Sequence, residues 1–212
     1  MTPRTAPPLA NSLKWALLVP LLLAFGGWVA QYPYGLIVVG VIIAVVTAFV
    51  AIAVVGSSWQ RPGAAVLVAV TGFALPIFAG PALYIVYMET LGESAPAVVT
   101  KVENRDARRG AGWFCTVVET RGDHAVHKIS QQENCFGQIK PLQKITLRKD
   151  PLGLLDPRLP DRPGESDTLL SVLLSAALFA ANAATFLYAG LRRKGEKSPP
   201  PKAPDLTARA ES

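Results

Sequence analysis

Long stretches without a charged residue limit the possible folds of this sequence more than any other feature. No Asp, Glu, Lys or Arg occurs from Trp15 to Gln60, from Pro62 to Met88 or from Thr168 to Leu191, which are runs of 46, 27 and 24 residues. A helix of about 20 apolar residues crosses the hydrocarbon core of a bilayer, which is roughly 30 Å thick. These runs therefore predict membrane-spanning helices.

The first run is too long for one span and must fold back. We place the break at residues 30–35, where polar Gln31 coincides with helix-breaking Pro33 and Gly35. The predicted fold is thus a membrane protein with four transmembrane helices, at about 13–29, 36–55, 64–88 and 168–191. The alternative for the first span is a cleaved signal peptide, but bulky Trp28 stands where a cleavage site needs a small residue.

The positions of the basic residues predict the orientation. With four spans both termini share one side, and that side carries nine basic and three acidic residues, whereas the segment 89–167 has twelve of each. Because basic residues near the spans mark the cytoplasmic side, Arg61, Arg192, Arg193 and Lys194 predict cytoplasmic termini in a multi-pass protein of the plasma (cytoplasmic) membrane. This topology explains the net charge of +6, so nucleic acid is not expected as a partner.

The fourth span has two features that favour helix packing. Ala176, Ala180 and Ala184 recur every four residues and form a small-residue stripe that lets another helix approach closely. Asn182 is a polar amide near mid-membrane, where it needs a hydrogen-bonding partner. The expected partner is another helix of the bundle, and the open alternatives are a homodimer or a second membrane protein.

Three prolines lie inside the predicted spans, namely Pro20, Pro76 and Pro81. Each bends its helix, either as a hinge or cavity lining or simply as a kink that fits the bundle. Apart from Lys14 at the start of the first span, no span contains an Asp, Glu, Lys, Arg or His residue, so a pump or a coupled transporter is not expected.

The segment 89–167 predicts a small all-β extracytoplasmic domain, an antiparallel sheet or partial barrel. Strands are expected at 97–102, 113–120, 125–130 and 144–148, and turn residues at 121–124 predict a hairpin between the second and third. We expect a turn or mobile loop at 104–112 and an extended linker at 156–164.

The two cysteines of the chain, Cys115 and Cys135, both lie in this β-module. A core this small needs a covalent link, so a disulfide is predicted, with Cys135 curling back from the end of a strand. A redox pair would favour C-x-x-C spacing, and a metal site that added His124 and His127 would have poor ligand spacing. We therefore expect no metal.

Other chemistry is not indicated by the sequence. The tripeptide at 121–123 matches an integrin-binding motif, but a hairpin turn favours the same residues. His127, Ser130 and Glu133 lack the surrounding motif of a nucleophilic enzyme, and no glycine-rich phosphate loop occurs. We predict no catalytic residue and no cofactor.

The order of these segments resembles a broad group of uncharacterised bacterial multi-span membrane proteins. The matching features are Ala-Val-Val-Thr-Lys-Val-Glu, a strand with a cysteine, an Arg-Gly-Asp turn, Lys-Ile-Thr-Leu-Arg-Lys-Asp-Pro-Leu-Gly and Pro-Arg-Leu, followed by an apolar span. The resemblance covers about 95–159 and the last span, and it implies a small extracytoplasmic β-module inserted before that span. The chain departs from the group in its strand end, Leu147-Arg148-Lys149, and in two extra N-terminal spans.

Three functions remain open. The first is a non-enzymatic binding protein that presents the β-module to a partner. The second is an accessory or ligand-sensing subunit of a transporter or envelope enzyme, with the kinked third span lining a pocket. The third is an envelope thiol oxidoreductase. Residues 1–12 are expected to be a disordered cytoplasmic N-terminus, and 192–212 a solvated basic cytoplasmic tail.

Overall fold

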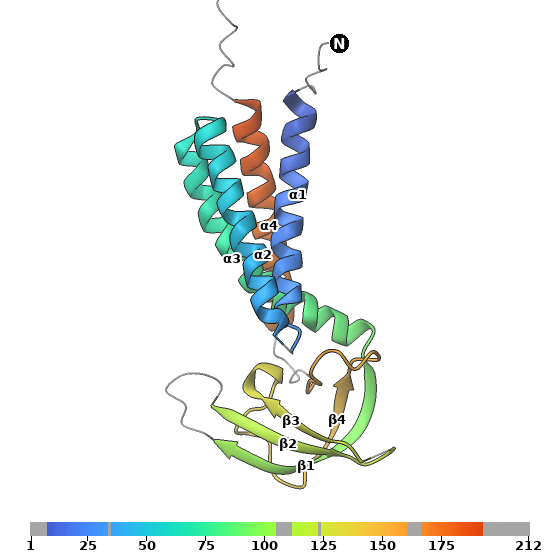
Figure 1. The fold of residues 1–212 in the computed structure, drawn as a ribbon. Coiled ribbons are helices and arrows are strands. Elements are labelled where there is room, and N and C mark those ends of the chain that lie inside the picture. The colour runs from blue at the N-terminus through green and yellow to red at the C-terminus, as the bar shows by residue number, and fades with distance from the viewer. Residues whose placement is uncertain (1–7, 34, 105–111, 123, 161–166, 193–212) are drawn as a thin grey trace, which may run out of the picture.

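The computed structural model describes residues 8–33, 35–104, 112–122, 124–160 and 167–192, as a helical bundle with a small sheet at one end (Figure 1). The helices are α1 (Pro8–Val29), α2 (Leu36–Ala53), α3 (Pro62–Thr90) and α4 (Asp167–Leu191), and a π-helical turn, η1 (Val54–Ser58), extends α2. Within the described residues, all four helices are long and apolar enough to cross a membrane. The four predicted apolar helices are therefore present.

α1 begins at Pro8, which corrects the prediction of a disordered segment over 1–12 for its last five residues. Proline is tolerated in the first turn of a helix, because the N–H groups there have no intrahelical partner. Ser12 is fully buried, and a Cβ added at Gly190 of α4 would meet its hydroxyl. The first turns of α1 thus pack against the last turns of α4.

The connection between α2 and α3 contributes an aromatic residue to the core of the bundle. Trp59 is buried, and its ring packs edge-on against Phe186 of α4 with centroids 5.9 Å apart. The π-helical turn carries Trp59 inward to this contact. The side chain is therefore a core residue of the bundle.

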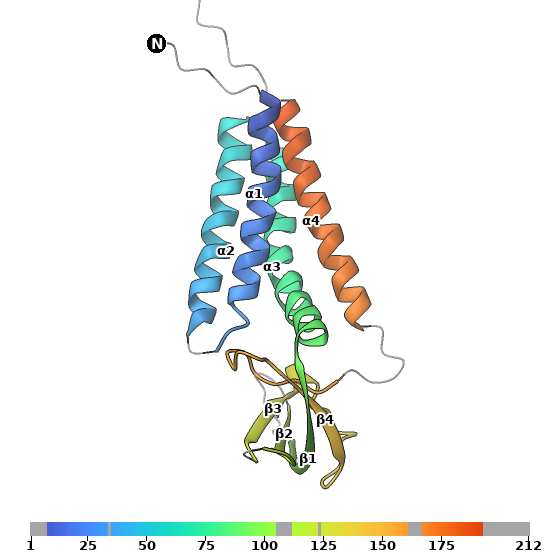
Figure 2. The ribbon, with the colours of Figure 1, turned by 90° about the vertical axis from the view of Figure 1, so that its right-hand side faces the viewer.

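α3 crosses α1 with the two backbones in contact. A Cβ at Gly80 would lie 2.4 Å from the carbonyl oxygen of Gly27, and one at Gly27 would lie 2.5 Å from the carbonyl oxygen of Pro76. Beyond this crossing α3 bends towards the sheet (Figures 1 and 2). Pro76 and Pro81 account for the bend, since a proline inside a helix removes a backbone hydrogen bond.

The sheet is antiparallel, with the described strands in the order β3-β2-β1-β4. β1 (Glu93–Asn104) is long and pairs through its first half with β4 (Lys144–Lys149) and through its second with β2 (Trp113–Glu119). β2 and β3 (Val126–Ser130) form the predicted hairpin. The register of β1 against β2 shifts between Val99 and Lys101, which is a β-bulge.

One face of the sheet holds the core of the module, which is covered by the chain after β3 and β4. Its buried apolar residues are Ala97, Val99, Cys115, Val117, Ile129, Cys135, Leu147 and Leu159. The segment that follows β4 lies between the sheet and the helices (Figures 1 and 2). It reaches α3 through a small apolar cluster of Tyr84, Met88 and Leu155.

The predicted linker 156–164 is partly bound to the module instead of extending freely. Arg158 exchanges backbone hydrogen bonds with Arg148 of β4, at 2.8 and 2.9 Å, and the N–H of Leu159 donates to the carbonyl of Glu133 in the short 3-10 helix η2 (Gln131–Glu133). Residues 161–166 lie outside the described part of the chain. So do most of the predicted loop 104–112, residues 1–7 and the tail beyond residue 192.

Candidate functional site

The predicted disulfide is present and lies in the core of the module. Cys115 on β2 is bonded to Cys135, and both residues are fully buried. The chain turns through η2 after β3, and the N–H of Cys135 donates to the carbonyl of Ser130 at 3.0 Å, so Cys135 does curl back from the strand end. Because the two sulfur atoms are bonded to each other, neither serves as a metal ligand in this structure.

The two histidines lie beside a buried carboxylate on β2. Nε2 of His127 is 2.6 Å from Oε1 of Glu119, and Nζ of Lys149 is 2.8 Å from the same oxygen. The hydrogen bond from Lys149 lowers the pKa of Glu119, with His127 adding to the effect against the opposing cost of burial. Nδ1 of His124 faces the backbone carbonyl of Glu119. These contacts link β2 to β3 through His127 and to β4 through Lys149.

Ser130 and Glu133 of the module are hydrogen-bonded to each other. Both the N–H and the hydroxyl of Ser130 donate to Oε2 of Glu133, which is a local turn contact. Within the described ranges, no group of three or more His, Cys, Asp or Glu residues is arranged to hold a metal ion. The polar residues of the module therefore have structural partners that account for their positions.

A second buried carboxylate joins the module to α3. Asp150, directly after β4, accepts hydrogen bonds from the hydroxyl of Tyr87 at 2.6 Å and from the N–H groups of Leu152, Leu154 and Leu155. Burial opposes its ionisation, but these four hydrogen bonds together hold the pKa of the Asp150 carboxyl below its ordinary range.

Another tyrosine adds to this junction. The hydroxyl of Tyr84, one turn earlier on α3, donates to the backbone carbonyl of Asp156 at 2.7 Å. The ring of Tyr87 also packs edge-on against Trp28 of α1, with centroids 5.4 Å apart. The module is thus fixed to the bent end of α3 by hydrogen bonds and packing, and not only by the chain connection at residues 91 and 92.

The turn at residues 140–143 presents an apolar side chain at a strained backbone position. Leu142 has φ 65°, and its side chain is 81% exposed. The turn is bound to β1, because the N–H of Leu142 donates to the carbonyl of Val99 at 2.7 Å and the N–H of Val99 donates to the carbonyl of Gln143 at 3.0 Å. Leu142 therefore stands on a fixed support beside the β-bulge.

The residues predicted on the fourth span separate into a buried and an exposed group. Asn182 is fully buried and its Nδ2 donates to Oγ1 of Thr71 on α3 at 2.8 Å, so its expected partner within the bundle is present. Ala176, Ala180 and Ala184 are exposed on the outer surface of α4. The small-residue stripe thus does not form the contact between α4 and α3, and a partner helix for it remains a prediction.

Two of the basic residues used to predict orientation, Arg61 and Arg192, lie at the end of the bundle opposite the sheet. Nε of Arg61 donates to the backbone carbonyl of Arg192 at 2.7 Å, and a terminal nitrogen of the same guanidinium donates to it as well. Arg193 and Lys194 lie outside the described residues. The first residue of α1 and the last of α4 are at this same end (Figure 1).

An apolar groove runs along the bundle between α1, α3 and α4. Its volume is about 680 Å³. It includes the inner side of the bend in α3, where Ala79, Ala82 and Val86 face Phe25 and Trp28 of α1. The wall on α4 consists of Val172, Ser175, Ala176 and Phe179. The kinked third helix thus lines a groove, as the ligand-sensing hypothesis requires.

Comparison with protein-family models, with curated proteins and with solved structures found no match for this chain. The resemblance described from the sequence motifs accordingly stays an expectation.

Proposed function

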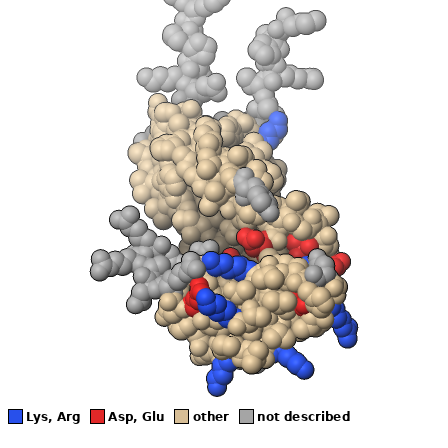
Figure 3. All heavy atoms as spheres, turned by 60° about the horizontal axis from the view of Figure 1, so that its bottom comes forward, with Lys and Arg blue, Asp and Glu red and all other residues tan. Residues whose placement is uncertain are grey.

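We propose that this chain is a multi-pass protein of the plasma membrane, with both termini in the cytoplasm, that presents its β-module outside the cytoplasm to a protein partner and catalyses no reaction. The four apolar helices, the uneven distribution of basic residues and the disulfide support this placement. On the face drawn in Figure 3, Lys and Arg side chains are spread across the module with Asp and Glu side chains among them, so no continuous basic patch is seen there. That pattern suits a protein partner better than nucleic acid.

The observation that supports the binding function is that leucine does not suit the backbone conformation of position 142 in its turn. Pro141 stands at the second position, Leu142 at the third with positive φ, and the N–H of Gln143 closes the turn on the carbonyl of Lys140 at 3.2 Å. A turn of this type favours Gly or Asn at the third position. Leucine there costs roughly 1–2 kcal/mol of backbone strain and leaves a large apolar group in water.

A side chain that is unfavourable for folding in this position and exposed at a fixed site has the properties of a binding anchor. Burial of a leucine side chain against a partner contributes about 1.5–3 kcal/mol, which offsets the strain. The cluster at Asp150 holds the module, and hence this anchor, in a defined position relative to the helices.

The test uses Leu142→Asn, which suits the turn but removes the apolar group. With a photocrosslinking residue at exposed Lys140, the wild-type chain should form one discrete crosslinked product in membranes of the source cells. L142N should lose this product while unfolding at a temperature equal to or above that of the wild type. The matched control is Arg121→Ala in the β2–β3 turn, which should keep the product. The proposal is wrong if L142N and R121A crosslink equally.

A second candidate function, ligand sensing, is favoured by the apolar groove. α3 lines this groove and also forms hydrogen bonds to the module through Tyr84 and Tyr87. An apolar ligand in the groove would therefore contact the helix that positions the module. Ala176→Trp should fill the groove and abolish any ligand-dependent rise in unfolding temperature. Ala177→Trp, on a neighbouring exposed position outside the groove, should preserve it. If the ligand-dependent rise in unfolding temperature is the same in the two variants, ligand sensing through this groove is wrong.

A further inference from the structure

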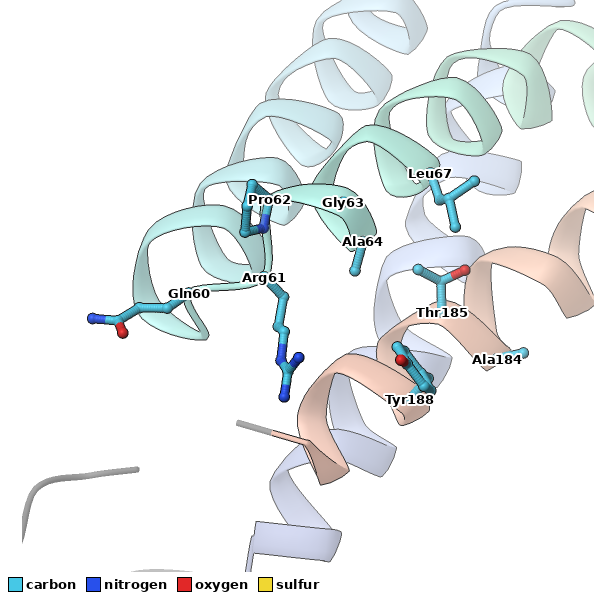
Figure 4. Close-up of a pocket in the computed structure, with 9 residues that line it drawn as sticks. All are labelled: Gln60, Arg61, Pro62, Gly63, Ala64, Leu67, Ala184, Thr185 and Tyr188. Carbon is cyan, nitrogen blue, oxygen red and sulfur yellow. The ribbon is translucent and has the colours of Figure 1, made fainter. Parts of the chain in front are cut away.

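A second groove lies at the end of the bundle opposite the sheet, between the start of α3 and the last turns of α4 (Figure 4). Its volume is about 670 Å³. One wall comes from the connection to α3 and its first turns, and the other from α4. The lining residues are Gln60, Arg61, Pro62, Gly63, Ala64, Leu67, Ala184, Thr185 and Tyr188.

The guanidinium group of Arg61 lines this groove, and that of Arg192 packs on Tyr188, another of its lining residues. Arg61 points towards the end of α4 (Figure 4), where it donates to the carbonyl of Arg192. A guanidinium has several N–H donors in one plane, so this contact leaves donors of Arg61 for another acceptor. The guanidinium of Arg192 lies over the ring of Tyr188, 5.1 Å from its centroid. Among the described residues, these two cations contact a backbone carbonyl and a tyrosine, and not a carboxylate.

No acidic side chain from these helices competes for the two arginines. The sequence contains no Asp or Glu from Met1 to Met88, nor from Thr168 to Gly195. The cationic end of the groove thus lacks a counter-ion from α1, α2, α3 or α4. A ligand with a phosphate or another compact anionic group would supply it.

The inner part of the groove is apolar. Leu67 and Ala184 flank it a few residues inward from the ends of their helices, which corresponds to about 10 Å of depth. The hydroxyl of Thr185 donates to the carbonyl of Ala181 at 2.7 Å, so it does not require a polar ligand. A cationic end followed by an apolar floor within this distance complements the anionic headgroup and first methylene groups of a lipid.

We propose that this groove binds an anionic phospholipid of the leaflet opposite the β-module. The phosphate lies at Arg61 and Arg192, and the start of one acyl chain lies along Leu67 and Ala184. A lipid with net negative charge is favoured over a zwitterionic one, because the headgroup of the latter carries an ammonium group towards the two arginines. The proposal depends on the insertion of the four helices in a bilayer and not on the partner of the module.

The test is native mass spectrometry of the full chain in a neutral detergent, titrated with phosphatidylglycerol or with phosphatidylcholine of the same acyl chains. The wild type should retain phosphatidylglycerol preferentially. Arg61→Gln should weaken that binding about fivefold or more, as expected for one arginine near a lipid phosphate. Lys14→Gln, which removes an exposed cation of α1 outside the groove, should not. Equal retention of both lipids, or equal effects of R61Q and K14Q, would overturn the proposal.

A second pair of variants tests the groove without removing a charge, and decides the matter if R61Q does not fold. Ala184→Trp should fill the groove and reduce phosphatidylglycerol binding, whereas Ala180→Trp, one turn away on the same exposed stripe, should not. Soluble glycerol phosphate distinguishes the source of the anion. If it competes as strongly as the intact lipid, the groove is a soluble-phosphate site and the lipid assignment is wrong. No competition at millimolar concentration supports the lipid.

Discussion

Asp150 is the single residue on which the attachment of the module to the helices depends most. Its carboxylate is buried and accepts from Tyr87 and from three backbone N–H groups, so its replacement leaves several donors without an ionised acceptor. We predict that Asp150→Asn lowers the free energy of unfolding by about 1–3 kcal/mol. The measurement is thermal unfolding of the purified chain in detergent.

The matched control is Asp156→Asn. Asp156 is exposed, and Tyr84 bonds to its backbone carbonyl rather than to its carboxylate. The free energy of unfolding of this variant should lie within about 0.5 kcal/mol of the wild-type value, as is usual for surface substitutions. If D156N destabilises the chain as much as D150N, the contribution assigned to the buried carboxylate is wrong.

The lowered pKa values of Asp150 and Glu119 predict how stability depends on pH. A carboxyl whose pKa is lower in the folded than in the unfolded state binds fewer protons when folded, so it stabilises the fold above its ordinary pKa of about 4. That stabilisation disappears as the pH falls through the lowered value. The wild type should therefore lose stability steeply below about pH 4.

Urea unfolding of the wild type and of D150N between pH 7 and pH 3 checks this prediction. The free energy of unfolding of the variant should be lower than that of the wild type at pH 7 and should fall less as the pH decreases. The two curves of unfolding free energy against pH should therefore converge. Parallel curves would mean that Asp150 has the same pKa in both states.

At the scale of elements, the crossing of α1 and α3 is the most sensitive contact in the bundle. A methyl group at position 80 would collide with the backbone of Gly27, which has no side chain that could move aside. We predict that Gly80→Ala costs roughly 1–3 kcal/mol, as expected for overpacking. The loss is measured as a fall in the detergent unfolding temperature.

Gly63→Ala, in the first turn of the same helix, is the control. A Cβ added there has no atom within 4 Å, and alanine favours a helix by up to about 1 kcal/mol over glycine. This variant should be as stable as the wild type or more so. A tolerated G80A would indicate that the two helices separate easily.

The disulfide is the element that compensates for the small core of the module. It closes a loop with a sequence separation of 20, for which the chain-entropy model gives a stabilisation of about 3 kcal/mol. Replacing both cysteines with alanine should destabilise the module by that order while leaving the helical circular dichroism of the bundle intact. Mass spectrometry of the untreated chain should find no alkylatable thiol, and free thiols at both positions would contradict the bond.

The elements were largely predictable from the sequence because their signals are local. Uncharged runs of bilayer length marked the helices, and alternating β-branched residues with turn chemistry marked the hairpin. The prediction failed where a distant contact decides. Residues 8–12 are helical instead of disordered, and Ser12 among them packs against Gly190 of α4.

The candidate site was less predictable than the fold. The bond between Tyr87 and Asp150 joins residues 63 positions apart, and no periodicity marks it. The positive φ of Leu142 depends on how its turn binds β1. Pro141 marks a turn there, but only the structure gives the sign of φ.

At the scale of the whole molecule, the charge distribution and the fold agree. The start of α1 and the end of α4 share one end of the bundle and the module occupies the other (Figures 1 and 2), so the described basic residues Lys14, Arg61 and Arg192 and the disulfide fall on opposite sides of the four apolar helices. Reducing conditions in the cytoplasm disfavour disulfides, and basic segments near the spans favour the cytoplasm. The disulfide and the basic residues thus both support the proposed exterior location of the module.

Labelling of intact cells with a membrane-impermeant maleimide tests this central claim most directly, because the native cysteines are bonded to each other and do not react. Two single-cysteine variants are compared, Gln138→Cys on the exposed surface of the module and Ser212→Cys at the end of the tail. The account predicts that Q138C is labelled in intact cells and that S212C is labelled only after the membrane is permeabilised. Labelling of S212C but not Q138C in intact cells would contradict it.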